Sequence, residues 1–163
     1  MNDSLSTPAR QRLAGLGFLA ARWLLGALFL CMGLGKALHP LDFLKLVRQY
    51  DLVQIPLALN LIGACLPWFE VFCGLLLLAG RAVRGTALAL VIMLIPFTAL
   101  IWHRALLLHA AVGLPFCAIK FDCGCGAGEV FICHKLAENA GLILLCCLLM
   151  CWCYPTRTLW STR

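Results

Sequence analysis

Cysteine, glycine and histidine residues able to support redox or metal chemistry gather over residues 117–134 of an otherwise apolar chain. Cys123 and Cys125 are one residue apart in the sequence DCGCGAGEVFICH, which covers residues 122–134. Disulfide exchange and the binding of a thiophilic metal ion both need cysteine sulfurs that an incoming group can reach. The glycines around the pair supply unusual backbone dihedrals and leave both sulfurs accessible. The stretch therefore predicts a redox-active pair or a metal site.

Three arrangements of these cysteines are open. A disulfide between Cys123 and Cys125 would close a small, strained ring, and strain makes such a bond an oxidant. Cys133 or Cys117 would then be the resolving thiol. A metal site would use Cys123, Cys125, Cys133 and His134, at a spacing more typical of soft thiophilic ions than of structural zinc. The third arrangement is a structural disulfide that joins Cys133 to Cys123 or Cys125.

The composition determines the class of protein that holds this stretch. Hydrophobic residues make up 63% of the chain and charged residues 12%, and the mean hydropathy is +0.97. These values lie far outside those of soluble domains. Each membrane-spanning helix needs about 20 apolar residues. We therefore expect one all-α integral membrane domain over residues 1–163, built as a four-helix bundle.

The apolar runs and their polar interruptions predict the elements of this bundle. Apolar residues at helical spacing between charges indicate an amphipathic helix in the membrane interface after the first span. The run after the third span is short and broken by glycine and proline, so it favours an extension of that helix over a fifth crossing. The expected elements are spans at 13–35, 56–80, 86–103 (or to 109) and 136–154, an interfacial helix at 40–53, and a cysteine loop at 104–135.

The positive charges suggest an orientation. With four crossings both termini share a side, and the arginines near that side predict that it is cytoplasmic. The cysteine loop would then face the extracytoplasmic space of a bacterial-type inner membrane, whereas a fifth crossing within 103–121 would reverse this. The net charge of +6 is scattered at helix ends, which indicates contacts with lipid and not with nucleic acid. The arginines on the side of the termini are Arg10, Arg12, Arg81, Arg84, Arg157 and Arg163.

Glu70 lies near the middle of the second span, where a lone carboxylate is costly. Arg22 in the first span and Lys36 at its outer end are the available cations. We expect a structural Arg22–Glu70 pair between the first two spans. The functional alternative is a proton or quinone site at these residues.

Several further cysteines lie inside the spans. There cysteine behaves as a small apolar residue, which is the expected role. The alternative is a thiol relay or a path for soft metal ions through CCLLMCWC in the last span. These cysteines are Cys31, Cys65, Cys73, Cys146, Cys147, Cys151 and Cys153.

Three stretches resemble the MauE family of membrane proteins, which is related to the DoxX-like group. They are RWLLGALFLCMGLGKALHPLDFLKLVRQY, LPWFEVFCGLLLLAG, and FDCGCG followed by HKLAENAGLILL. The resemblance implies a four-helix membrane protein of thiol–disulfide chemistry that acts with a thioredoxin-like partner in the maturation of a disulfide-containing enzyme. Cys123 and Cys125 match the paired cysteines of the family. Its polar positions match Arg22, Lys36, Glu70 and Asn139.

Together these features predict a membrane protein that exchanges disulfides with a thioredoxin-like or disulfide-containing extracytoplasmic partner, as a thiol–disulfide oxidoreductase. Electrons would pass from the cysteine pair to a quinone or to buried thiols. One alternative is a carrier of copper, mercury or zinc that uses Cys-X-Cys and the intramembrane cysteines. The other is a non-catalytic assembly subunit of a membrane redox complex.

Overall fold

Four long helices dominate the computed structural model, which describes residues 7–49, 56–113, 115–122 and 129–151. They are α1 (Thr7–Leu38), α3 (Pro56–Ala79), α4 (Val83–Val112) and α5 (Ile132–Cys151). Each contains a segment long and apolar enough to cross a membrane. The prediction of an all-α, four-helix membrane bundle is confirmed.

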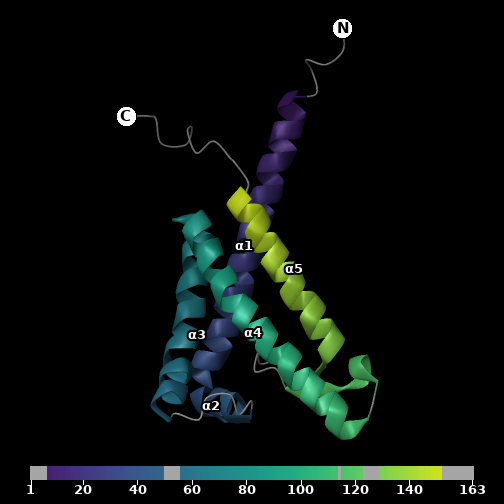
Figure 1. Cartoon of the computed structure of the whole chain (residues 1–163). Coiled ribbons are helices and arrows are strands. Elements are labelled where there is room, and N and C mark those ends of the chain that lie inside the picture. Colours follow the sequence, from purple (N-terminus) through teal and green to yellow (C-terminus); the bar gives the residue numbers. More distant parts are fainter. Residues whose placement is uncertain (1–6, 50–55, 114, 123–128, 152–163) are drawn as a thin grey trace.

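Successive long helices run in opposite directions, so the start of α1 and the end of α5 lie at one end of the bundle (Figure 1). The opposite end holds the short helix α2 (Pro40–Gln49) and a small β hairpin. In α2, Phe43 is buried while Asp42 and Lys45 are exposed, as expected for an amphipathic helix at an interface.

Helices α1 and α3 pack closely because glycines lie on both facing surfaces. A Cβ atom added at Gly74 of α3 would lie 2.7 Å from the backbone nitrogen of Leu30 in α1. One added at Gly33 of α1 would lie 2.8 Å from the carbonyl oxygen of Pro67 in α3. Lipid chains are as apolar as leucine, so small residues that allow close backbone contact are a main source of helix association in membranes.

The core of the bundle is apolar and draws on all four long helices. Many large apolar side chains on the outer surface are exposed, as expected where lipid surrounds the helices. The buried core residues are Leu25, Phe29, Cys73, Leu77, Ala87, Leu90, Leu94, Leu142, Cys146 and Leu149.

Helix α4 is longer than the third span predicted from the sequence and ends at Gly113, whose positive φ of 69° favours glycine. The amide of Gly113 donates to the carbonyl of His109. The described residues after it form a 3₁₀ turn, η1 (Phe116–Ala118), and the strand β1 (Lys120–Asp122). Within the described part of the chain, residues 103–121 therefore add no fifth crossing.

Candidate functional site

A two-stranded hairpin carries the segment that contains Cys123 and Cys125. Strand β1 pairs antiparallel with β2 (Glu129–Phe131), with Asp122 opposite Glu129 and Lys120 opposite Phe131. The Ile132 amide extends the ladder by donating to the Ile119 carbonyl at 3.1 Å. Residues 123–128, which connect the two strands, lie outside the described residues. The pair of cysteines therefore belongs to the connection of a hairpin whose two strands have a defined register.

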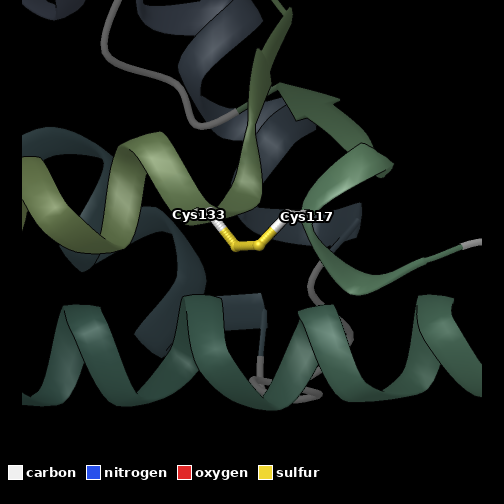
Figure 2. Close-up of a disulfide and its surroundings, with 2 residues drawn as sticks. All are labelled: Cys117 and Cys133. Carbon is white, nitrogen blue, oxygen red and sulfur yellow. A yellow bond between two sulfur atoms is a disulfide. The ribbon is translucent and has the colours of Figure 1, made fainter.

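A disulfide between Cys117 and Cys133 closes the base of this hairpin (Figure 2). Cys117 lies in η1 and is exposed, whereas Cys133 is the second residue of α5 and is half-buried. Their Cα atoms are 5.1 Å apart and 16 positions separate them in sequence. The sequence had named both as alternative resolving thiols but did not predict that they pair with each other. The alternative pairing of Cys133 with Cys123 or Cys125 is absent from this structure, because Cys133 is bonded to Cys117. We call residues 117–133 the cysteine hairpin.

Apolar packing attaches the cysteine hairpin to α4 and α5. Ile119 and Ile132 are buried against Ala105 of α4. The ring of Phe116 in η1 lies 5.5 Å from that of Trp102 in α4, measured between centroids. The base of the hairpin is thus held by side-chain packing as well as by the disulfide.

Lys36 and Glu70 form a buried ion pair between α1 and α3. Lys36 Nζ donates to both carboxylate oxygens of Glu70, at 2.6 and 2.7 Å. The two side chains are only 6% and 5% exposed. Lys36 Nζ also lies 5.6 Å from the centroid of the Phe43 ring in α2. A bidentate contact satisfies the carboxylate where no water is available, which is the condition for a stable charge pair inside a membrane.

The expected Arg22–Glu70 pair was wrong. The antiparallel register of α1 and α3 places Arg22 against Gly80, at the end of α3, and Lys36 against Glu70. At 1.5 Å per residue, Glu70 and Gly80 are about 15 Å apart along the helix axis. Arg22 is therefore level with the connection between α3 and α4 and not with the middle of the membrane.

Asn139 is buried and links α5 to α4 through a side-chain hydrogen bond. Its Nδ2 donates to Thr98 Oγ1 at 3.1 Å, and Thr98 Oγ1 donates to the carbonyl of Leu94 at 2.7 Å. Lys135, one turn earlier in α5, is also buried, and its Nζ lies 2.8 Å from Glu138 Oε2. Lys36, Glu70, Lys135 and Asn139 are thus buried polar side chains of α1, α3 and α5, and we call them the polar cluster.

Sequence reasoning missed the roles of Lys135 and Thr98. Lys135 was counted only as a basic residue of the loop, because the start of α5 was placed one residue after it. Thr98 is a single hydroxyl in a long apolar helix, and the signal that could have singled it out is that Asn139 needs a polar partner in a neighbouring helix.

The cysteines inside the long helices do not gather around a metal site. Cys73 and Cys146 are buried in the apolar core, while Cys31, Cys65 and Cys151 are exposed. No group of three or more metal-ligating side chains occurs among the described residues. The alternative set of Cys123, Cys125, Cys133 and His134 also lacks a thiolate in this form, because the Cys133 sulfur is in a disulfide.

Comparison with known proteins gives the family. Residues 15–153 match the family model described as methylamine utilisation protein MauE. The chain belongs to the MauE family. The matched region contains all of α3, α4 and α5, most of α1, and the whole cysteine hairpin. No curated protein and no solved structure matches the chain. The polar cluster and the disulfide described above therefore belong to the MauE portion of this membrane protein.

Proposed function

We propose that this MauE family protein exchanges disulfides with a thioredoxin-like or disulfide-containing extracytoplasmic protein through Cys123 and Cys125. The observation that carries the proposal is the Cys117–Cys133 disulfide, which closes the base of the hairpin whose connection contains both cysteines. One hairpin thus contains two cysteine pairs. The first would exchange disulfides with the partner, and the second would accept electrons from the first.

The proposed reaction begins when a thiolate of the partner attacks one sulfur of an oxidised Cys123–Cys125 pair. A mixed disulfide forms and the other cysteine of the pair leaves as a thiolate. The partner's second thiolate then attacks the mixed disulfide and releases the oxidised partner. Two electrons and two protons have moved from the partner's thiols to Cys123 and Cys125.

The reduced pair would then be reoxidised by the disulfide at the hairpin base. A thiolate of the pair attacks Cys117, which is exposed, and Cys133 leaves. The position of Cys133 in the first turn of α5 favours this direction, because unpaired amides at a helix N-terminus stabilise negative charge. The second thiolate of the pair then attacks the first cysteine's sulfur in its mixed disulfide with Cys117. The Cys123–Cys125 bond is restored, and Cys117 leaves as a thiolate.

A membrane quinone is the proposed acceptor of the two electrons left on Cys117 and Cys133. The polar cluster supports this choice, because Lys135 and Asn139 follow Cys133 in the same helix and could hydrogen-bond a quinone head group. A quinone reduced to a quinol takes up two electrons and two protons, which balances the oxidation of the two thiols.

The proposed orientation has both termini in the cytoplasm of a bacterial-type cell and the cysteine hairpin outside the inner membrane. The disulfide supports it, because such bonds persist outside the cytoplasm and are rare inside. The arginines at the other end of the bundle agree with the rule that cytoplasmic ends are basic.

The test is disulfide mapping of the purified protein by mass spectrometry after rapid acid quench and alkylation, across glutathione buffers of different potential. We expect Cys123 and Cys125 to become reduced near −200 mV, about the range of catalytic disulfides. Replacement of both by serine should sharply lower the amount of mixed disulfide formed with glutathione, whereas Cys31→Ser with Cys65→Ser should lower it much less. Cys123 and Cys125 that remain free in every buffer, and become protected only with copper, zinc or mercury, would instead indicate a metal carrier.

A further inference from the structure

Arg22 is a partly buried cation for which the described residues provide no partner. Its Nε atom is buried and lacks a hydrogen-bond partner, and the described residues provide no ion pair to its guanidinium. The guanidinium lies against Gly80, where a Cβ atom would overlap it. The sequence has no acidic residue between Asp3 and Asp42, and none between Glu70 and Asp122. The described residues around Arg22 therefore supply no anion.

The N-terminus of α4 begins three residues after Gly80, which Arg22 contacts, and it has no side-chain cap. Its N-cap residue, Ala82, is in the left-handed region with φ 49° and makes no side-chain cap. Thr86, in the first turn, is 4% exposed, and its Oγ1 has no hydrogen-bond partner. Amides in an uncapped first turn attract anions, because they donate without an internal acceptor. Arg22 Nε and Thr86 Oγ1 are the buried side-chain atoms without a partner in the described part of the chain.

The level of this region in the membrane matches that of lipid phosphates. Helix α3 ends at Ala79 and α4 begins at Val83, so their connection marks the end of two membrane crossings. Helix α1 continues past Arg22 to Thr7, a length of about 22 Å at 1.5 Å per residue. Arg81 and Arg84 add positive charge at the connection. Cationic pockets between helices at this depth are suited to anionic head groups.

We propose that Arg22 and the first turn of α4 bind the phosphate of an anionic phospholipid. The guanidinium offers a planar set of donors to phosphate oxygens, and the α4 amides and Thr86 hydroxyl offer more. The site lies at the opposite end of the bundle from the cysteine hairpin, so it does not depend on disulfide exchange. Its ligand would pair with the guanidinium of Arg22 beside the α3–α4 connection.

The test measures lipid binding to the full-length protein by native mass spectrometry after release from vesicles of equal phosphatidylcholine and phosphatidylglycerol content. We expect phosphatidylglycerol to bind in preference, and Arg22→Gln to weaken its binding by about tenfold or more, as for the loss of a charge-assisted hydrogen bond. The matched control is Arg12→Gln, which removes the same charge from an exposed position of α1 and should change binding less than about twofold.

Equal effects of Arg22→Gln and Arg12→Gln would overturn the proposal, as would equal binding of the two lipids by the wild-type protein. Displacement of the lipid by millimolar inorganic phosphate would also overturn it, because the ligand would then be free phosphate. If Arg22→Gln does not fold, hydrogen exchange in the wild-type protein tests the proposed lipid site instead. Phosphatidylglycerol should slow exchange at residues 81–85 relative to phosphatidylcholine, and an unchanged rate would contradict the site.

Discussion

The buried Lys36–Glu70 pair gives the sharpest test of how this bundle is stabilised. At a distance of 2.6 Å and an effective dielectric constant near 20, the attraction between the two charges is about 6 kcal/mol. Desolvation of both side chains offsets part of it, since each is almost fully buried. Removing one partner should therefore destabilise the protein by about 3–5 kcal/mol, because the other charge stays buried and unpaired.

A double-mutant cycle isolates this coupling. Lys36→Met and Glu70→Leu should each be strongly destabilising, whereas the double variant should be much less so, because it leaves no buried charge. We expect a coupling of at least about 2 kcal/mol. The assay is reversible unfolding in lipid bicelles. Steric trapping of the separated helices measures the free energy of unfolding.

The exposed pair of Lys45 and Asp42 in α2 is the matched control. Its charged atoms lie 3.1 Å apart, but the side chains are 75% and 73% exposed. The same cycle there should give a coupling below about 0.5 kcal/mol, because water and salt screen exposed charges. A Lys36–Glu70 coupling no larger than that of the control would refute the reasoning that the pair is shielded from water and bidentate.

Three further predictions follow from contacts in the bundle and the hairpin. Cys133→Ser should lower the free energy of unfolding by about 3 kcal/mol in oxidising buffer, from loop closure, and have little effect under reducing conditions. Gly74→Ala should destabilise the α1–α3 packing by more than about 1 kcal/mol, whereas Gly141→Ala, where a Cβ meets open space, should be neutral or stabilising in the same unfolding assay. Asn139→Leu should cost about 0.6–1.7 kcal/mol through loss of its bond to Thr98, and the loss should be smaller when Thr98→Val is also present.

The sequence was sufficient for the number and type of the long helices. Apolar runs of spanning length are a strong signal, because backbone groups inside lipid must be satisfied by helices or closed barrels. The contact of Lys36 with Glu70 was harder to predict, because the sequence does not show where each apolar run enters the membrane. Helix α1 begins at Thr7 and extends past the α3–α4 connection, so an equal count along two helices does not place residues at an equal level.

The hairpin and its disulfide could not be predicted from the sequence, for a different reason. Strands β1 and β2 have three residues each, too few to show the alternation that identifies a strand. Four nearby cysteines allow several pairings, and the choice depends on which Cα atoms the fold brings together. The sequence did direct attention to Cys117 and Cys133, while Cys123 and Cys125 stay a prediction, since they lie outside the described residues.

The closed base of the cysteine hairpin should allow residues 123–128 to be replaced. A disulfide joins Cys117 to Cys133. The strand register and the packing of Ile119 and Ile132 fix residues 119–122 and 129–132. We therefore expect a change in the length or sequence of residues 123–128 to have little effect on the stability of the helices. For the disulfide exchange that we propose, related proteins could then differ in partner through residues 123–128 while the membrane helices stay the same.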